Sequence, residues 1–378
     1  MPYRRLSGFY FFYFATIGAL VPYWGLYLKS LNFSAAQIGE TIGALVVSRI
    51  IAPNLWAWVA DHTGQRLTIV RLTSLLSCFA GLGVLFVVDY FPLLLVMLAF
   101  GFFWSSSLPQ LEAITLSHLK DSPHIYPRIR VWGSIGFILA VGTLGALIEH
   151  YGVGVVPPVL FALIVGIWLA SLGIPAQGPE IPRMSPGPLR QILMRPAVLA
   201  LFAVCFLVQA AHGPYYTFYS IYLKESGYSP SLTGWLWALG VITEVGLFLI
   251  MHWVLPRFGL RQLLLASLWL AVLRWWLIGA YVHNLPILVF AQTLHAATFG
   301  VFHAVAIQYI HRYFVGRHQG RGQALYNSLS AGAGGFIGSM TSGYTWDSLG
   351  PAATLNFAAL ASALALGIAW RWIGEESL

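Results

Sequence analysis

The sequence predicts an all-α membrane protein with twelve transmembrane helices, and three observations carry this prediction. Of the 378 residues, 58% are hydrophobic and 8% are charged, which is more apolar surface than a soluble domain of this length can bury. Apolar runs of about 20 residues, long enough to cross a bilayer as a helix, recur between short polar breaks. These runs are continuous rather than alternating, which disfavours a membrane β-barrel.

The polar breaks delimit the spans in order along the chain. The first span follows the short basic stretch MPYRR, and its apolar run is too long for the core of a signal peptide. Every run is expected to be a helix, because a segment in lipid must satisfy its own backbone hydrogen bonds. The predicted spans are approximately residues 6–29, 36–59, 67–88, 92–119, 126–149, 155–174, 196–223, 231–255, 262–281, 286–313, 320–346 and 351–372.

The chain also repeats itself. Residues 27–39, YLKSLNFSAAQIG, align with residues 222–234, YLKESGYSPSLTG, at an offset of 195 residues. At the same offset, GQR at 64–66 aligns with GLR at 259–261. Each half then holds six spans, and the first spans of both halves run in the same direction. The two halves are therefore predicted to form a parallel repeat about a pseudo-twofold axis.

The segment between the sixth and seventh spans is rich in proline and has little apolar periodicity, which predicts a cytoplasmic linker. An ordinary loop between two spans is the alternative, but the length of the segment favours a connector. The predicted organisation is an N-terminal six-helix half at 1–174, a linker at 175–195 and a C-terminal six-helix half at 196–378.

The net charge of +8 does not indicate nucleic-acid binding, because the basic residues are distributed as in a membrane protein. When alternate loops are assigned to opposite sides, 15 of the 20 Lys and Arg residues lie on the side of the N-terminus and two lie opposite. The positive-inside rule then predicts cytoplasmic N- and C-termini in a bacterial-type inner (plasma) membrane. We expect the chain to function as a monomer in the lipid bilayer.

No motif for catalysis, a metal or a cofactor is recognised. The chain has no Walker loop, no G-x-S-x-G, no H-E-x-x-H and no Cys–His cluster. Cys78 and Cys205 both fall inside predicted spans, so no disulfide framework is implied. The glycine-rich GAGGFIG at 332–338 also lies inside a span, where small residues favour close helix packing over phosphate binding. We therefore expect neither an enzyme nor a cofactor-dependent protein.

Five charged residues are the strong cases of an ionisable group within a predicted span, where each costs about 2.5–3.5 kcal/mol on insertion scales and is expected to face a cavity or a partner. Glu112 precedes the turn at Asp121 by nine residues and Arg130 follows it by nine, so a hairpin brings the two to similar depth. The five residues are Arg49, Glu112, Arg130, Glu244 and Arg274.

Glu244 and Arg274 form a second candidate pair. Glu244 lies 13 residues before Arg257, and Arg274 lies 13 residues after Arg261. At about 1.5 Å per residue, both lie about 20 Å from the predicted cytoplasmic side. Structural salt bridges that hold hairpins together are the alternative, whereas one such pair in each half of a repeat favours a central polar cavity.

Two further spans carry polar faces. In the seventh span, Gln209, His212 and Tyr216 recur three and four residues apart and therefore share a face. An intramembrane histidine is either a packing residue with satisfied hydrogen bonds or a group that relays protons. Three residues of the tenth span also share a face, namely Gln292, His295 and Thr298.

The loop ADHTGQR at 60–66, between the second and third spans, resembles the cytoplasmic-loop signature of the major facilitator superfamily. Asp61, Gly64 and Arg66 match its acidic, glycine and basic positions. The resemblance implies that these residues stabilise one gating state through charge contacts with helix ends. An ordinary polar turn is the alternative.

LEA at 111–113 and RIRVWGSIGF at 128–137 resemble the fourth- and fifth-span signature of lactose permease-like proton symporters. The resemblance implies twelve spans that move substrate and proton together by alternating access, as two halves rock against each other. It also implies that Glu112 and Arg130 bind substrate, that Glu244 contacts it, and that Arg274 and His295 take part in proton coupling.

One position departs from that pattern. Thr298 stands where these symporters carry a proton-carrying glutamate three residues after the histidine. The proton carrier is therefore open, with Glu244 and His295 as the candidates. Coupling is expected to involve Glu112, Glu244, Arg274 and His295.

The whole chain also resembles the 3-phenylpropionate permease group, through stretches such as QAAHGPYYTFYSIYLKESGYS, GWLWALGVITEVGLF and LRWWLIGA. This resemblance implies proton-coupled import of a small aromatic carboxylate, with an arginine at the carboxylate and aromatic side chains at the ring. A nucleoside or oligosaccharide symporter is one alternative, and a membrane sensor that does not transport is another. The predicted substrate-binding residues are Arg49, Glu112, Arg130, Gln209, His212, Tyr216, Glu244, Arg274 and His295.

Overall fold

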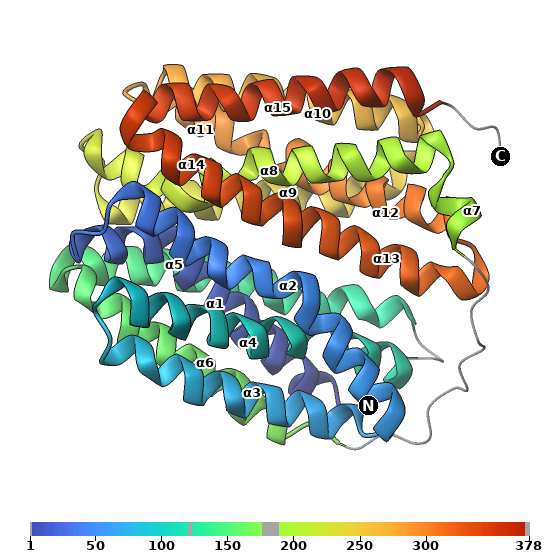
Figure 1. Ribbon diagram of the computed structural model, residues 1–378, viewed down its shortest axis with the longest axis horizontal. Coiled ribbons are helices and arrows are strands. Elements are labelled where there is room, and N and C mark those ends of the chain that lie inside the picture. Colours follow the sequence, from blue (N-terminus) through green and yellow to red (C-terminus); the bar gives the residue numbers. More distant parts are fainter. Residues whose placement is uncertain (1, 120–122, 176–188, 375–378) are drawn as a thin grey trace. The chain divides into compact units, whose positions relative to one another are not determined.

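The computed structural model describes residues 2–119, 123–175 and 189–374, and within these ranges it contains helices and no strand (Figure 1). The all-α prediction is therefore confirmed. The longer helices are α1 (Tyr3–Ser30), α2 (Ala35–Thr63), α3 (Arg66–Leu82), α4 (Tyr90–His118), α5 (Tyr126–Tyr151), α6 (Val156–Leu172), α8 (Pro196–Glu225), α9 (Pro230–Phe258), α10 (Leu260–Ala280), α11 (Leu285–Thr293), α12 (Phe302–Tyr313), α13 (Gln319–Asn327), α14 (Gly335–Leu349) and α15 (Pro351–Trp372).

Eleven helical segments of the described chain are long and apolar enough to cross a membrane. The remaining predicted span, 320–346, is also helical, but it is rich in glycine and serine and consists of α13, the π-helical η6 (Ser328–Gly334) and α14. A second π-helical segment, η4 (Ala296–Val301), separates α11 from α12. Most of the predicted linker, 176–188, lies outside the described residues, and the short α7 (Arg190–Leu193) follows it.

The helices form two compact units. Unit 1 consists of Met1–Ile181 and Tyr219–Ala238, and unit 2 consists of Pro182–Phe218 and Leu239–Leu378. In unit 1, α1 packs against α5 and α6, while α4 packs against α2 and α3. In unit 2, α10 packs against α15, α11 and α12. The boundary predicted at 175–195 remains a prediction.

The hairpin Tyr219–Ala238, where α8 meets α9, is the part of unit 1 that comes from the second half of the sequence. Lys29 at the end of α1 forms an exposed ion pair with Glu225 at the end of α8. The backbone N–H of Ser231 donates to the Glu149 carboxylate at the end of α5, at 3.2 Å. Polar contacts thus fasten this hairpin to the ends of α1 and α5.

The backbone repeats with the offset seen in the sequence. Asn32 (φ 63°) and Gly227 (φ 89°) both adopt the left-handed region, and they are 195 residues apart. Gly64 (φ 66°) and Gly259 (φ 71°) repeat at the same offset in the turns that follow α2 and α9. The two halves therefore share turn geometry as well as sequence, as a parallel repeat requires.

Glycines allow helices to cross closely at equivalent positions of the two halves. A Cβ added at Gly18 in α1 would lie 2.8 Å from the carbonyl oxygen of Phe137 in α5. A Cβ at Gly213 in α8 would lie 2.2 Å from the carbonyl carbon of Gly338 in α14. Gly338 belongs to GAGGFIG, so the packing role predicted for that stretch is confirmed.

Two arginines cap helix ends in corresponding ways. Arg71 in α3 donates to three backbone carbonyls at the C-terminal end of α6. Arg261 in α10 donates to two backbone carbonyls at the C-terminal end of α15. Such contacts satisfy carbonyl groups that have no partner within the helix, and they place positive charge at the negative end of the helix dipole.

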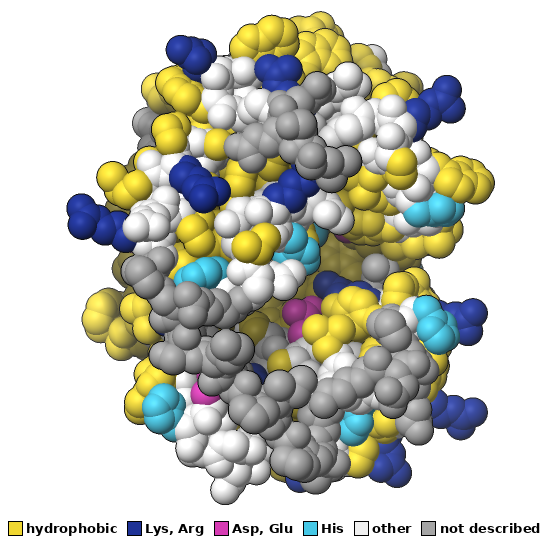
Figure 2. Space-filling model, turned by 90° about the vertical axis from the view of Figure 1, so that its right-hand side faces the viewer, with side chains coloured by type: hydrophobic (Ala, Val, Ile, Leu, Met, Phe, Trp, Pro, Cys, Tyr) yellow, Lys and Arg dark blue, Asp and Glu magenta, His cyan; other side chains and the backbone are white. Residues whose placement is uncertain are grey.

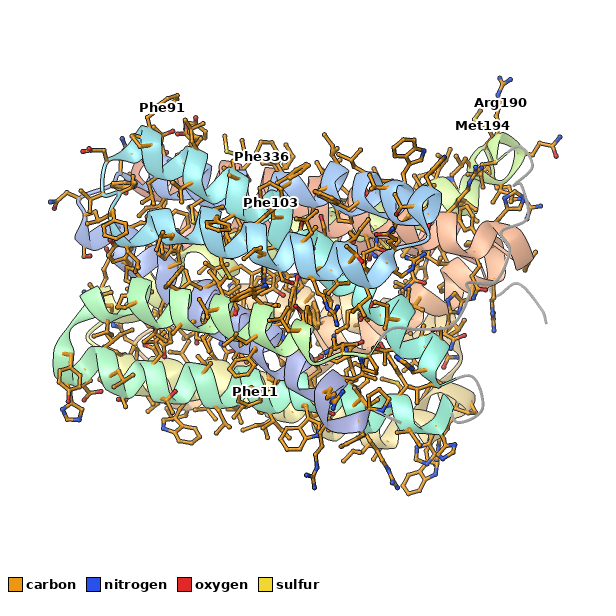
Figure 3. The ribbon with its side chains drawn as sticks, turned by 90° about the horizontal axis from the view of Figure 1, so that it is seen from below. Phe11, Phe91, Phe103, Arg190, Met194 and Phe336 are labelled. Carbon is orange, nitrogen blue, oxygen red and sulfur yellow. The ribbon has the colours of Figure 1, made fainter. Side chains whose placement is uncertain are left out.

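The outer surface fits a lipid environment. Large apolar side chains such as Phe91, which is 63% exposed, project outward from the ribbon (Figure 3). The face on the right of Figure 1 carries many Lys and Arg side chains and few Asp and Glu side chains (Figure 2). Apolar flanks together with a basic end are typical of a protein that spans a membrane.

The close crossing of α1 and α5 yields a stability prediction. A Cβ at Gly136 would lie 2.2 Å from the carbonyl oxygen of Phe11, so Gly136→Ala should force α1 and α5 apart and cost about 1–3 kcal/mol of unfolding free energy. Gly142 lies on the same helix with nothing within 4 Å, so Gly142→Ala should be neutral or slightly stabilising. Melting temperatures of the detergent-purified proteins measure both effects, and equal values for the two variants would contradict the close crossing.

Candidate functional site

Glu112 in α4 and Arg130 in α5 lie together in unit 1, as the hairpin depth predicted. Their closest atoms, Oε1 and Nε, are 3.9 Å apart, and each side chain is 35% exposed. The Arg130 guanidinium also lies over two aromatic rings of α1, 4.1 Å from the centroid of Phe14 and 5.5 Å from that of Tyr10. The charge of Arg130 is therefore shared between a loosely paired carboxylate and aromatic faces.

Arg49 in α2 contacts a different part of unit 1. Its guanidinium carbon lies 5.6 Å from the ring centroid of Trp104 in α4. Trp104 is stacked between Tyr13 and Phe100, with centroid distances of 4.9 Å and 5.5 Å. Among the described residues, Arg49 has neither an ion pair nor a hydrogen bond.

Arg274 in α10 is completely buried in unit 2. Its guanidinium carbon lies 4.5 Å from the ring centroid of Tyr215 and 4.6 Å from that of Trp275. The same group donates four hydrogen bonds to the segment that follows α10. The acceptors are the Ala291 carbonyl at 3.1 Å, His295 Nδ1 at 3.1 Å, Thr298 Oγ1 at 3.1 Å and Gln292 Oε1 at 3.4 Å.

His295 links Arg274 to Glu244. A guanidinium can only donate, so Nδ1 of His295 must accept from Arg274 through its lone pair. The ring proton then resides on Nε2, which lies 3.4 Å from Glu244 Oε2. The result is an ordered chain of donors and acceptors from Arg274 through a neutral His295 to the Glu244 carboxylate. The two members of the second predicted pair, Arg274 and Glu244, thus both contact one histidine.

Of the three seventh-span residues, His212 and Tyr216 lie beside the Arg274 cluster, and Gln209 does not. His212 Nδ1 donates to the Val208 carbonyl at 2.7 Å, and its ring lies edge-on to Trp275 at 4.9 Å. Tyr216 lies beside His212, with ring centroids 5.4 Å apart. Gln209 lies further along α8, where its Cβ faces Gly334 of η6. His212 and Tyr216 therefore adjoin the Arg274 cluster, whereas Gln209 packs against η6.

The π-helical η4 changes which residues of the tenth span share a face. It begins directly after His295 and contains Thr298 and Phe299. The ring of Phe299 stacks between His295 and His303, with centroid distances of 5.3 Å and 6.1 Å. His303 Nδ1 also forms a hydrogen bond with the Tyr326 hydroxyl at 2.9 Å. π-Helical turns are rare and cluster at functional sites, and the sequence pattern alone did not indicate this one.

The predicted gating loop is ordered by charge contacts. Gly64 ends α2 in the left-handed region at φ 66°. Arg66 Nη2 donates to Asp61 Oδ1 at 2.9 Å, and Arg66 Nη1 donates to Gln110 Oε1 in α4 at 2.5 Å. Gln110 is 1% exposed, so the loop is tied to the interior of unit 1 through a residue that the sequence analysis did not assign to it.

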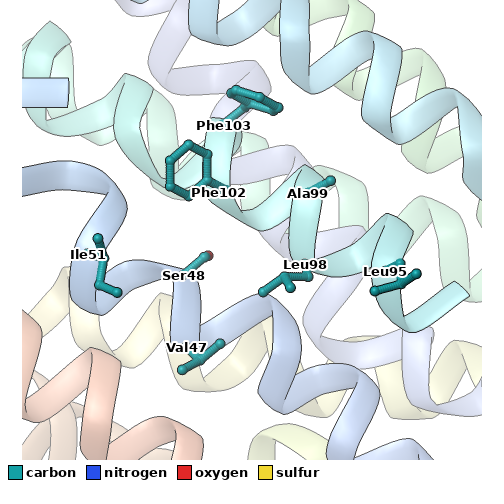
Figure 4. Close-up of a pocket in the computed structure, with 8 residues that line it drawn as sticks. All are labelled: Val47, Ser48, Ile51, Leu95, Leu98, Ala99, Phe102 and Phe103. Atoms are coloured by element: carbon teal, nitrogen blue, oxygen red, sulfur yellow. The ribbon is translucent and has the colours of Figure 1, made fainter. Parts of the chain in front are cut away.

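A groove of about 430 Å³ lies between α2 and α4, and Figure 4 shows its lining. Ser48 is its one polar lining side chain, and that hydroxyl donates to the carbonyl of Leu45. A groove without charge or free polar groups is poorly suited to an ionic substrate. The charged clusters are therefore better candidates for the site. In the described part of the chain, His, Cys, Asp and Glu side chains form no group of three or more that would hold a metal ion.

Two tryptophans were missed from the sequence. Trp104 lies within one apolar run with Glu112, and Trp275 directly follows Arg274, but aromatic residues in spans are lipid-facing by default. What marks them is burial beside a guanidinium, since Trp104 is 1% exposed and Trp275 is fully buried. For Trp275, its position next to the in-span Arg274 was the available signal, whereas the sequence offered none for Trp104.

Comparisons with known proteins agree with this architecture. A family model described as the MFS_1 like family matches residues 3–357. The chain is 33% identical to the probable 3-phenylpropionic acid transporter of Escherichia coli (strain K12), with 92% of each chain covered. It is 26% identical to the putative nucleoside transporter YegT of the same organism, covering 84% of this chain and 78% of that protein. A crystal structure of the nucleoside transporter NupG has a TM-score of 0.85 at 18% identity, covering 99% of this chain and 100% of that one.

The buried hydrogen bonds of Arg274 predict that no other cation can replace it. Lysine presents one ammonium group and cannot supply the planar fork that reaches four acceptors, so Arg274→Lys should lower the unfolding free energy by at least about 2 kcal/mol. Arg257→Lys, at an exposed position of α9, is the matched control and should melt like the wild type. A melting temperature of Arg274→Lys equal to that of the control would show that the hydrogen bonds do not hold this cluster.

Proposed function

The chain belongs to the MFS_1 like family and is a multi-pass membrane transporter rather than an enzyme, and we propose that it imports a small aromatic carboxylate together with a proton by alternating access. The 33% identity over 92% of a probable 3-phenylpropionic acid transporter supports this cargo. The charges inside the spans provide the physical argument.

The observation that carries the proposal is an excess of positive charge inside the helices. The five charged residues singled out within the spans are three arginines and two glutamates, namely Arg49, Arg130, Arg274, Glu112 and Glu244. Glu40, near the start of its span, accepts a hydrogen bond from the Tyr90 hydroxyl and is not among them. Within this set of five, one positive charge is left over in an environment where a charge is costly. A monocarboxylate neutralises that charge on binding, whereas a neutral nucleoside or sugar leaves it unpaired.

The geometry around His295 supports Glu244 as the proton carrier. Nδ1 of His295 accepts from Arg274, so a second ring proton would have to break that hydrogen bond. The Glu244 carboxylate meets the Nε2 side of the same ring at 3.4 Å and can take up a proton without displacing Arg274. His295 then acts as the residue that orients Glu244, and Arg274 fixes the ring.

Charge balance couples the two cargoes. Protonation of Glu244 removes one of the two negative charges and raises the excess positive charge from one to two. An anion then binds more tightly, and by linkage the bound anion favours protonation by the same factor. Substrate and proton therefore load together, which is the requirement for symport.

The orientation is part of the proposal. We place both termini in the cytoplasm of a bacterial-type inner membrane, because 15 of the 20 basic residues lie on that side of the predicted topology. The basic face of the space-filling view supports this assignment (Figure 2). We propose that the chain works as a monomer, with Asp61, Gly64 and Arg66 stabilising one gating state.

Uptake by proteoliposomes tests the function. With an inwardly directed proton gradient, labelled 3-phenylpropionate should accumulate inside, because proton entry drives the anion. A protonophore should abolish the accumulation, and protein-free liposomes give the background. Uridine and maltose, tested in the same assay, should neither accumulate nor compete.

Three results would contradict the proposal. Gradient-driven uptake of uridine or maltose, without a response to 3-phenylpropionate, would favour the nucleoside or oligosaccharide alternative. Accumulation of 3-phenylpropionate that ignores the proton gradient would remove the coupling. Ligand binding in detergent without counterflow in proteoliposomes would favour a sensor.

Glu244→Gln separates coupling from substrate movement. The amide oxygen can still accept a hydrogen bond from His295 Nε2, but the side chain cannot take up a proton. Accumulation of 3-phenylpropionate against its gradient should therefore be lost, while its movement down a gradient persists. Glu225→Gln, which removes an exposed carboxylate at the end of α8, should behave like the wild type in both assays. If Glu244→Gln still accumulates substrate against a gradient, the proton is carried elsewhere.

A further inference from the structure

We propose that Arg49, Trp104 and Tyr13 form the subsite of unit 1 that receives the carboxylate of the substrate and the aromatic ring attached to it. The inference rests on the proposed function, since it takes the cargo to be an aromatic carboxylate, and it assigns residues to each part of that molecule. It depends on an arginine without a counter-ion, a buried N–H donor without an acceptor, and a stack of aromatic rings at the same place.

Arg49 is the in-span cation whose charge has no counter-ion. Within residues 2–119, 123–175 and 189–374, its guanidinium forms no ion pair and no hydrogen bond, and its carbon lies 5.6 Å from the centroid of the Trp104 ring. The side chain is partly exposed rather than sealed, so a ligand can reach it. All five N–H donors of the guanidinium remain for a carboxylate, whose two oxygens match that planar fork.

The other two in-span arginines, Arg130 and Arg274, already have polar or ionic partners in the protein. Arg130 has the Glu112 carboxylate at 3.9 Å and the Phe14 ring at 4.1 Å. Arg274 is completely buried and donates four hydrogen bonds to protein acceptors. A substrate carboxylate would have to compete with Glu112 at the first and displace protein acceptors at the second. Arg49 requires neither, which makes it the first contact for the anion.

Trp104 supplies an independent sign that an acceptor is missing. Its indole is 1% exposed, and its Nε1–H has no hydrogen-bond partner among the described residues. Buried N–H groups are nearly always paired, because an unpaired donor loses its hydration without compensation. A carboxylate oxygen held by the guanidinium over this ring is an acceptor of the right kind for the indole N–H.

Aromatic rings pack against Trp104 and fix its position beside Arg49. Tyr13 stacks on Trp104 at 4.9 Å with an interplanar angle of 13°, and Phe100 stacks on it at 5.5 Å and 19°. A cation next to stacked rings recognises a molecule with an anionic end and an aromatic body, because each part contacts a surface of matching chemistry.

The close packing of α2 on α4 fixes Arg49 beside Trp104. Gly101 lies one helical turn before Trp104, and a Cβ there would lie 2.7 Å from the Leu45 carbonyl oxygen and 2.8 Å from Ser48 Oγ. The absence of a side chain at Gly101 lets the α2 backbone approach α4 just before Arg49. The guanidinium is therefore held over the indole by the helix crossing.

A purely structural role for Arg49 makes a different prediction. If the guanidinium only braces Trp104 through its ring contact, neutralising it weakens folding and affects all ligands alike. If it binds the carboxylate, the loss is specific to ligands that carry a negative charge. Two ligands that differ only in the charged group, measured on the same protein variants, distinguish these two roles.

The experiment measures the affinity of the full-length protein in detergent for 3-phenylpropionate and for its neutral amide, 3-phenylpropanamide. Arg49→Gln should weaken binding of the carboxylate by roughly tenfold or more, the loss expected for a charge-assisted hydrogen-bonded pair, and leave amide binding unchanged. Arg49→Lys keeps the charge and should lose less. Trp104→Phe keeps a ring but removes the N–H, and should weaken binding of the carboxylate by a few-fold and binding of the amide, whose carbonyl is a weaker acceptor, by less. Arg128→Gln, at an exposed position, is the control for a lost charge.

The outcomes distinguish this inference from the function on which it rests. Wild-type protein that binds no carboxylate would overturn the proposed cargo and the subsite together. Wild-type protein that binds 3-phenylpropionate, with Arg49→Gln binding it equally well, would overturn the subsite and leave the function standing. Equal losses for the carboxylate and the amide would assign Arg49 to bracing Trp104. Should Arg49→Gln fail to fold, Arg49→Lys and Trp104→Phe still decide, because only the subsite predicts a loss that is larger for the carboxylate than for the amide.

Discussion

Three arginines lie inside helices that are otherwise apolar, and the need to stabilise their charges organises the interior of both units. Each guanidinium lies against aromatic rings, but the three differ in their hydrogen-bond acceptors and counter-ions. Arg274 has four protein acceptors, Arg130 has one loosely placed carboxylate, and Arg49 has the ring of Trp104. The number of polar partners thus falls from Arg274, through Arg130, to Arg49, which is left available for a ligand.

The proposed function gives the two units different duties. In unit 2, the hydrogen bonds of Arg274 fix the His295 ring and direct its Nε2–H toward Glu244, which suits a proton that must bind at a defined atom. In unit 1, Arg49 has no counter-ion among the described residues, which suits an anion that must bind and leave. A repeated fold allows the two halves to meet these requirements separately.

Sequence reasoning succeeded where distance along a helix axis was enough. Equal separations from a turn brought Glu112 beside Arg130, and the common offset of 195 residues reappeared in the left-handed turns at Gly64 and Gly259. Sequence reasoning failed where a contact depends on which face of the helix a residue lies on. The π-helical turn after His295 shifts the register of the residues that follow, and no periodicity rule anticipates it. Likewise, the burial of Trp104 depends on which face of α4 meets α2, which composition alone does not determine.

Thr298 connects the charge balance to the choice of cargo. In the symporters that the sequence resembles, a glutamate occupies this position, and here Thr298 Oγ1 accepts a hydrogen bond from Arg274 at 3.1 Å. The hydroxyl satisfies the guanidinium without adding a negative charge, so the five charged residues singled out within the spans remain three arginines and two glutamates. A carboxylate at the same place would cancel the remaining positive charge of that set and suit a neutral sugar. Under the proposed function, a neutral acceptor at Thr298 therefore has two consequences: the proton binds at Glu244 instead, and one guanidinium is left to pair with an anionic substrate.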